Sequence, residues 1–362
     1  MSLKHIERHG KAILTTLLAK IFPVRKVNLA ALQEVNRILI FRLDRRIGNG
    51  ILLLPLIRAI RETRPDVQVD VLINPTVADL FRQYATHLVY RVIAYDQGYL
   101  FRHPWHWVTL IRSLRKKAYA LVISSTNPDA FSLSQALLAR MMGTGFTLGF
   151  RWKNSPRFYD ITVPSSTQKH YADAQIDLWR VLEPNAPFIP GGLQVPQKNI
   201  YEVWESLPAE FKGDVLFWLG ATGDKLLTED AVSFIYETLL KTGYANIVLV
   251  AGPEDRQRMG HLSSRWQEKI LYWHHPLPRT AAYFAGFQLF ISGDTGPMHL
   301  AVAVGVPTVT IFTSTNLIQY GYQDGRNHFA LNWKNTVESK IQLETILEKL
   351  SVTHGKNIPQ NH

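Results

Sequence analysis

Short apolar runs alternate with longer amphipathic segments in the first half of the chain. Residues 37–43 (RILIFRL) predict a buried strand, and the apolar positions of residues 51–64, after a polar glycine loop, recur with helical spacing. Helices separate the further expected strands, at residues 67–73, 89–95, 120–124 and 146–150. Strands that alternate with helices indicate a parallel sheet covered on both faces.

The same alternation starts again in the second half. Strands are expected at residues 214–220, 246–252, 289–293 and 308–312. Helices are expected at about residues 229–242, from the end of the second of these strands through Gln257, after Pro297, and at about residues 337–350. The fold class predicted is therefore α/β, with two doubly wound, Rossmann-like halves.

A segment rich in proline and glycine separates the two halves. Residues 184–196 contain four prolines and the pair Gly191–Gly192, which is typical of a linker, although a long surface loop is the alternative. The linker interpretation predicts an N-terminal extension, a first domain, a second domain, and a C-terminal helix with a tail, at residues 1–36, 37–190, 191–335 and 336–362.

The N-terminal extension has the pattern of a basic amphipathic helix. Apolar residues recur at helical spacing from Ile6 to Ile21, lysines and arginines lie between and after them, and Pro23 ends the pattern. Such a helix either lies on an anionic membrane surface or packs its apolar stripe against the protein. A signal peptide is disfavoured because Glu7 and Lys20 interrupt the required pattern.

Composition narrows the function classes. The 362 residues include no cysteine, which excludes disulfides, thiol catalysis and thiolate metal sites, and no apolar run is long enough for a transmembrane helix. Residues 1–190 carry 26 Lys and Arg against 13 Asp and Glu, whereas residues 191–362 carry 14 against 16. This asymmetry predicts either a polyanionic partner for the first half or general solubility. Without nucleic-acid-binding motifs, an anionic lipid or phosphorylated glycolipid is favoured over nucleic acid.

Residues 291–312 (ISGDTGPMHLAVAVGVPTVTIF) form the most informative segment. They combine a strand end, a glycine-bracketed polar turn, a short helix and another strand. Gly293 and Gly296 allow a tight turn. Pro297 suits the first turn of a helix because its missing N–H would be unpaired there.

A helix that begins directly after a strand is suited to anion binding, because its N–H groups and positive dipole end attract phosphate. Asp294, Thr295 and Gly296 are expected to line such a pocket at the carboxyl edge of the sheet, and His299 to face the same crevice. This arrangement predicts a nucleotide-like ligand. The alternative is an ordinary connection in which Asp294 or Thr295 only caps the helix.

The sequence GDTGPMH followed by LAVAVGVPTV resembles the nucleotide-sugar site of the ADP-heptose:lipopolysaccharide heptosyltransferases, glycosyltransferase family 9. The resemblance extends in matching order from about Arg37 to Phe312 and is strongest in the second half. It implies a GT-B fold, in which two Rossmann-like domains face a central cleft. It also implies a donor site with Lys225 as a catalytic, charge-balancing cation, formed by Thr222, Lys225, Glu254, Asp294, Thr295, Gly296 and His299.

Alternatives remain for two of these residues. Lys225 is either the cation that balances the charge of the departing diphosphate or one member of a solvated ion pair with Asp224. Glu254 either binds nucleoside hydroxyls or caps a helix. The aromatic residue that the family carries two positions after the lysine is Leu227 here.

The first loop departs from the family pattern. Relatives usually read R-L-[SD]-[SR]-I-G-D, with the last Asp as the general base, whereas this chain reads RLDRRIGNG and has Asn49 at that position. An amide does not accept a proton at neutral pH, so Asp44 serves as the base, another group does, or the enzyme is impaired; Asp44 as a simple cap is also open. Acceptor contacts are expected from Arg42, Arg45, Arg46 and Asn49.

The resemblance implies an inverting glycosyltransferase that moves heptose from ADP-heptose to the lipopolysaccharide inner core, a lipid A–Kdo acceptor, on the cytoplasmic face of the bacterial inner membrane. The sequence contains no D-x-D, so transfer without metal or other cofactor is expected. A same-fold transferase for another nucleotide sugar, and a non-catalytic nucleotide-sugar-binding or assembly protein, are the alternatives.

Overall fold

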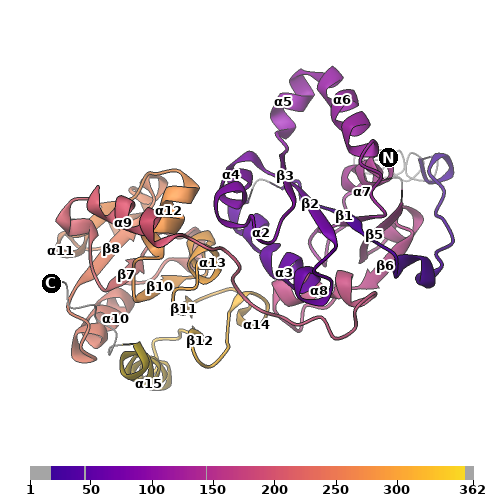
Figure 1. Ribbon diagram of the computed structural model, residues 1–362. Coiled ribbons are helices and arrows are strands. Elements are labelled where there is room, and N and C mark those ends of the chain that lie inside the picture. The colour runs from indigo at the N-terminus through magenta and orange to yellow at the C-terminus, as the bar shows by residue number, and fades with distance from the viewer. Residues whose placement is uncertain (1–17, 45, 144, 355–362) are drawn as a thin grey trace, which may run out of the picture. The chain divides into compact units, whose positions relative to one another are not determined.

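The computed structural model describes residues 18–44, 46–143 and 145–354. The chain forms two compact units (Figure 1). The first comprises the described residues up to Ile189 except Arg46–Leu54 and Gln83–Ala85. Those two segments group with the second unit, which otherwise begins at Pro190.

The first unit contains a parallel sheet of six strands in the order β3-β2-β1-β4-β5-β6. Its strands are β1 (Arg37–Phe41), β2 (Gln68–Ile73), β3 (Arg91–Ala94), β4 (Leu121–Ser124), β5 (Phe146–Arg151) and β6 (Ile161–Pro164). The five strands predicted in this half are confirmed, whereas β6 was not predicted. β1 and β4 are almost entirely buried, which explains their continuous apolar runs.

Helices connect these strands. They are α3 (Leu54–Thr63), α4 (Pro75–Tyr84), α5 (Gln97–Arg102), α6 (Pro104–Arg115), α7 (Leu133–Met142) and α8 (Tyr171–Arg180), and the short α2 (Ile47–Ile51) groups with the second unit. The single helix predicted at residues 51–64 is thus two helices. The break fits the sequence, because Pro55 is tolerated in the first turn of α3 but not within a longer helix.

The second unit repeats the topology, with a parallel sheet in the order β12-β11-β10-β7-β8-β9. Its strands are β7 (Val215–Trp218), β8 (Ile247–Ala251), β9 (Ile270–Tyr272), β10 (Leu289–Gly293), β11 (Thr308–Phe312) and β12 (His328–Asn332). Numbered from its own first strand, each sheet has the Rossmann order 3-2-1-4-5-6. The predicted doubly wound α/β class is confirmed.

The helices of the second unit are α9 (Gln197–Glu205), α10 (Glu229–Lys241), α11 (Ser264–Gln267), α12 (Leu277–Phe284), α13 (Gly296–Ala303), α14 (Leu317–Tyr320) and α15 (Val337–His354). The helix predicted through Gln257 is wrong, because that segment forms two 3₁₀ turns, η5 (Pro253–Asp255) and η6 (Arg258–His261). The buried Asp255 side chain accepts the Gly252 N–H and closes the first turn locally.

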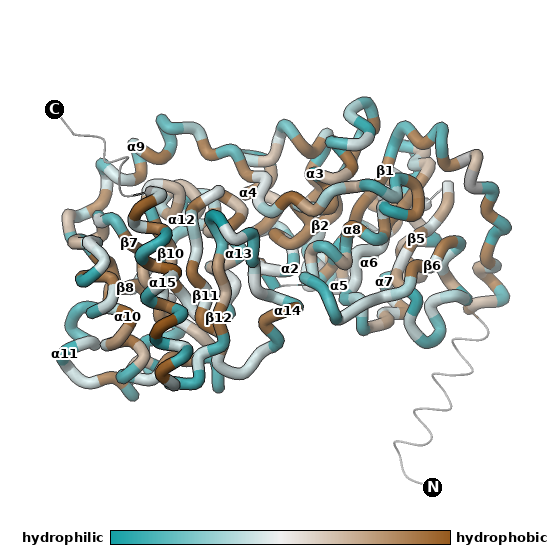
Figure 2. Tube along the Cα trace, turned by 90° about the horizontal axis from the view of Figure 1, so that it is seen from below, coloured by the Kyte–Doolittle hydropathy of each residue, from teal (hydrophilic) through white to brown (hydrophobic). Residues whose placement is uncertain are grey.

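The second core contains both sheet residues and the last helix. α15 alternates hydrophobic and hydrophilic residues along its length (Figure 2), and its Leu343, Leu347 and Leu350 are buried in this core. The proline-rich segment before α9 contains neither helix nor strand, and its Leu193 N–H donates to Ala303 O at the end of α13.

Residues 1–17 of the predicted basic helix lie outside the described residues. The described end of this helix packs on the first unit: Leu18 and Ala19 contact its core, and the Arg25 N–H donates to Asp160 Oδ1 at 2.7 Å. Asp160, with a fully buried side chain, also pairs with Arg140 at 2.7 Å. Among the described helices, none combines the length and apolarity needed to cross a membrane.

Candidate functional site

The candidate site lies in the second unit, where the strand order reverses. β7 and β10 are neighbours in the sheet, but the chain passes from β7 to β8 on one side before it returns to β10 on the other. The loops that follow such strands diverge and leave a crevice at their carboxyl ends, which is where ligands bind in open α/β sheets. Here these loops carry η4 (Gly223–Lys225) and the turn before α13.

Lys225 and Asp294 join these two loops. Lys225 Nζ lies 2.6 Å from Asp294 Oδ2, and Asp294 is only 6% exposed, whereas the Lys225 side chain is 32% exposed. The hydroxyl of Thr315, after β11, donates to the same carboxylate oxygen at 2.7 Å. The ion-pair partner of Lys225 is therefore Asp294, not its neighbour Asp224. The carboxylate holds a partly exposed cation at the switch point of the sheet.

The start of α13 has no side-chain cap. Thr295 occupies the N-cap position with extended backbone, but no hydrogen bond links its side chain to the first turn, and the Asp294 carboxylate is directed to Lys225 and Thr315. The simple capping interpretation of these residues is therefore wrong. Among the described residues the buried Thr295 hydroxyl finds no hydrogen-bond partner, which costs about 1–3 kcal/mol unless a ligand supplies one. A Cβ at Gly296 would meet no atom within 4 Å, so the helix start is open on this side.

His299, on the first turns of α13, is buried next to this pair. Its Nδ1 lies 3.4 Å from the Tyr322 hydroxyl, and the two rings meet edge to face. Burial lowers the pKa of His299 to about 4; Asp294 opposes this shift and Lys225 adds to it. The ring is therefore neutral near pH 7. A Cβ at Gly48, in α2, would lie 3.0 Å from His299 Cδ2, so α2 packs closely on this ring.

Thr222 and Glu254 lie on the loops after β7 and β8. Both are exposed, and Gly223 follows Thr222 with φ of +58°, a left-handed conformation that glycine adopts without strain. Glu254 does not cap η5, because that role belongs to Asp255, which accepts the Gly252 N–H at 3.2 Å. The loop that carries Glu254 follows β8, the neighbour of β7 in the sheet.

The residues of the first loop divide between the units. Arg42, in the first unit, is 2% exposed, and its guanidinium donates to Asp44 Oδ2 at 2.6 Å, Ser125 O at 3.0 Å and Asn127 Oδ1 at 2.6 Å. These contacts fix Asp44, whose side chain is 32% exposed. Arg45 lies outside the described residues.

Arg46 and Asn49 group with the second unit, in the segment of α2. Gly48 of this helix approaches both His299 and Gly296. The position at which family members carry their proposed base is therefore in the helix that packs on the start of α13.

Sequence reasoning missed Thr315, Tyr322 and Asp255 as members of the site region. Thr315 carried a readable signal, because the polar run TSTN directly follows a predicted strand at the same sheet edge. Leu227, at the family's aromatic position, is buried in the core, and its carbonyl accepts a hydrogen bond from His261 Nε2.

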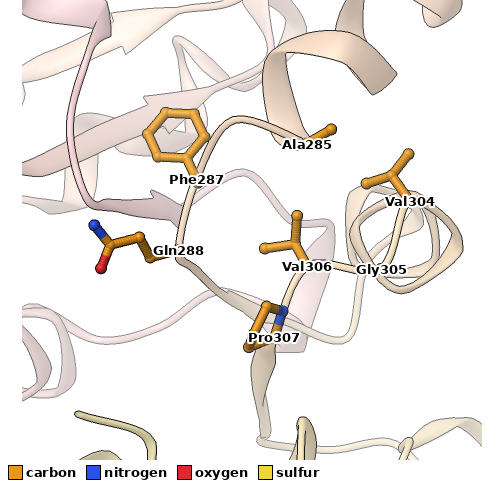
Figure 3. Close-up of a pocket in the computed structure, with 7 residues that line it drawn as sticks. All are labelled: Ala285, Phe287, Gln288, Val304, Gly305, Val306 and Pro307. Atoms are coloured by element: carbon orange, nitrogen blue, oxygen red, sulfur yellow. The ribbon is translucent and has the colours of Figure 1, made fainter. Parts of the chain in front are cut away.

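A separate cavity of about 200 Å³ lies at the opposite end of the same strands (Figure 3). Its lining includes Phe287, Gln288 and Pro307, which precede β10 and β11, and contains no charged side chain. It therefore offers no side-chain cation to balance the charge of a phosphate group.

Two Rossmann-like units, with an uncapped helix start at the switch point of the second, are typical of a GT-B glycosyltransferase. The sequence pattern of glycosyltransferase family 9 (heptosyltransferase) matches residues 107–349. This chain belongs to that family.

Individual relatives are distant in sequence but similar over most of their length. Lipopolysaccharide heptosyltransferase 3 of Escherichia coli K12 is 23% identical over an alignment of 301 positions, and the alignment covers 74% of this chain and 80% of the relative. The family 9 glycosyltransferase of Veillonella parvula has a TM-score of 0.66 at 18% identity and covers 92% of this chain and 98% of its own. E. coli heptosyltransferase WaaC, solved with ADP, has a TM-score of 0.62 at 19% identity over 87% and 99%. At these identities the solved structures establish the fold.

Proposed function

We propose that this glycosyltransferase transfers a heptose from ADP-heptose to the inner core of lipopolysaccharide, with inversion at the anomeric carbon and without a metal ion. One observation supports the donor site most strongly. The Lys225–Asp294 pair lies beside an uncapped helix start, where the buried Thr295 hydroxyl has no partner in the part of the chain that the structure describes. A diphosphate would complete the hydrogen bonding of this turn.

The chemistry of transfer requires stabilisation of the leaving nucleoside diphosphate. Negative charge grows on the oxygen that departs from the anomeric carbon, and a fixed cation with aligned N–H groups stabilises it without reorganisation. In this proposal Lys225 supplies the cation and the first turn of α13 the N–H groups. Thr222 and Glu254 complete the site from the loops after β7 and β8, with Glu254 accepting from the nucleoside hydroxyls. The neutral ring of His299 adds no positive charge.

The acceptor hydroxyl loses its proton to a general base, a role that we assign to Asp44. Its carboxylate is ionisable, partly exposed and oriented by the buried Arg42, whereas Asn49 carries an amide. Arg42 then acts as a positioning residue for Asp44. Arg45, Arg46 and Asn49 remain candidates for contacts with acceptor phosphates and carboxylates.

The proposed acceptor is the lipid A–Kdo core, an anionic glycolipid. A basic first half suits such a substrate, and in this proposal the enzyme works as a peripheral protein on the cytoplasmic face of the bacterial inner membrane. The name of the E. coli relative, lipopolysaccharide heptosyltransferase 3, supports the same class of acceptor.

A transfer assay tests the proposal. Purified protein with EDTA, ADP-heptose and a heptose-deficient core acceptor should release ADP only when both substrates are present, and a UDP-sugar should react at least about tenfold more slowly. Efficient transfer from another nucleotide sugar would replace heptose with that sugar. An absolute requirement for a divalent cation would contradict metal-independent transfer.

Asn49 motivates one rival, a nucleotide-sugar-binding protein without transferase activity. It predicts ADP binding together with no transfer from any nucleotide donor. The same assay, paired with a binding measurement, separates the two.

A further inference from the structure

The helical hairpin α5–α6 presents a face that the fold of the first unit does not use. In Figure 1 the two helices extend beyond the sheet of that unit, and only His103 separates them. Tyr99 and His106 hold the hairpin together, with the tyrosine hydroxyl 3.2 Å from His106 Nε2.

One side of α6 packs against the core of the first unit. Leu114 is 2% exposed, and Trp107, Leu110 and Ile111 pack against the same hydrophobic cluster. Because successive residues of a helix are about 100° apart, the opposite side carries Trp105, Val108, Arg112 and Lys116.

The outward side of α6 combines an exposed aromatic residue with positive charge. Trp105 is 80% exposed, Val108 is 38% exposed, and Arg112, Arg115 and Lys116 are exposed as well. An exposed tryptophan at the tip of a hairpin contributes nothing to the packing of α6, which Trp107 already provides.

The charge of this region has a single sign. Residues 97–128 contain no Asp or Glu, and Asp96, which precedes them, uses its side chain to cap α5 through the Tyr99 N–H. Arg102 and the run Arg115–Lys117 flank the hairpin with further cations. An anionic partner therefore meets no repulsion along this helix.

We propose that the outward face of α6, defined by Trp105, Val108, Arg112 and Lys116, docks the protein on the surface of an anionic phospholipid bilayer. Trp105 lies at the level of the lipid headgroups, where an amphipathic indole is most favourable, and the basic residues contact lipid phosphates. The tryptophan and valine favour a bilayer over a purely polyanionic partner, which would need only the charges. This inference rests on the proposed function to the extent that a membrane glycolipid is the acceptor.

Vesicle flotation of the full-length protein tests the docking face. Vesicles of phosphatidylcholine and phosphatidylglycerol in equal parts should bind the wild type, and phosphatidylcholine alone should bind it at least about tenfold more weakly. Trp105→Ser, and separately Arg112→Glu with Lys116→Glu, should each lower binding to the mixed vesicles about tenfold or more.

Matched controls use exposed residues elsewhere. Trp152→Ser removes an exposed tryptophan of the same unit, and Lys198→Glu with Lys241→Glu reverses two exposed charges of the second unit. Both controls should float like the wild type. All variants should bind ADP with unchanged affinity, which verifies folding and keeps this test separate from that of the donor site.

Three results would overturn the proposal. If both α6 variants floated as well as the wild type, this face would be excluded as the membrane contact. If deletion of residues 1–17 then abolished flotation, the N-terminal segment would be the membrane contact. Loss of binding in the charge variant but not in Trp105→Ser would indicate a general polyanion site. Dissociation of a dimer by Trp105→Ser with unchanged flotation would identify a second copy of the chain as the occupant.

Discussion

Lys225 Nζ and Asp294 Oδ2 lie 2.6 Å apart although the two residues are 69 positions apart in the sequence. The pair ties the loop after β7 to the turn before α13 at the point where the strand order of the second sheet reverses. Because Asp294 is almost fully buried and Thr315 donates to the same oxygen, the position of the lysine ammonium is fixed by the fold.

Lys225→Met should reduce kcat/KM for sugar transfer by about 10²–10³, because a fixed cation stabilises the leaving diphosphate most in the transition state. Steady-state kinetics of ADP release measures this effect. Lys198→Met, an exposed lysine of the same unit, is the control and should react like the wild type. Wild-type rates for Lys225→Met would exclude the catalytic role of this residue.

Asp44→Asn should lower turnover by about 10²–10⁴ while ADP affinity stays unchanged, because a general base acts on the acceptor and not on the donor. Single-turnover transfer and calorimetry measure the two quantities. Asn49→Asp restores the family's residue and should maintain or raise activity. If Asp44→Asn turns over like the wild type, Asp44 has only a structural role in the loop.

The free energy of unfolding should fall as the pH is lowered from about 6.5 to 4, in part through His299. Its pKa is lowered to about 4 in the folded state, so the unfolded chain binds more protons than the folded chain within this window. The contribution of His299 to the free energy of unfolding is fully present above about pH 6.5. His328, which burial also shifts to a lower pKa, contributes in the same direction.

Urea titrations of the wild type and His299→Gln across this range isolate the contribution of His299, which amounts to at most about 3 kcal/mol. The variant should have a shallower pH dependence below pH 6.5 and the same dependence above pH 7. Identical slopes in both proteins below pH 6.5 would show that His299 titrates normally.

Asp160→Asn should destabilise the first unit by about 3 kcal/mol, because it leaves the buried Arg140 without its counterion. It also weakens the attachment of residues 22–25, which contact Asp160 and Arg140. Denaturant unfolding measures the loss, and Asp79→Asn, an exposed acid of the same unit, is the control. A change below about 0.5 kcal/mol would mean that this pair contributes no net stability.

The sequence was sufficient to predict the strands that are buried on both faces, because their apolar runs are continuous. It was insufficient for β6 and β12, whose residues are mixed in polarity, and for β9, which has only three residues. The helix predicted through Gln257 failed because Asp255 closes a 3₁₀ turn, a local hydrogen bond that periodicity does not reveal.

The part of the site that belongs to a sequence motif could be predicted. The turn before α13 could be identified from glycine, proline and strand spacing, but the Lys225–Asp294 pair depends on which loops the strand order brings together. Asp44 and Asn49 are five positions apart in sequence, but they group with different units. The sequence alone therefore does not identify the catalytic base, because it does not reveal with which unit each of these two residues groups.

Calorimetric titration of ADP in EDTA, with wild type and Asp294→Ala, tests most directly that the second unit binds the donor through Lys225 and α13. The wild type should bind in the micromolar range, and Asp294→Ala should bind at least about tenfold more weakly, a loss of about 1.4 kcal/mol, because Lys225 is no longer held at the turn. Asp224→Ala, an exposed acid in the same loop, should bind like the wild type. Unchanged or tighter ADP binding by Asp294→Ala, as expected if its carboxylate only repels phosphate, would contradict this donor site.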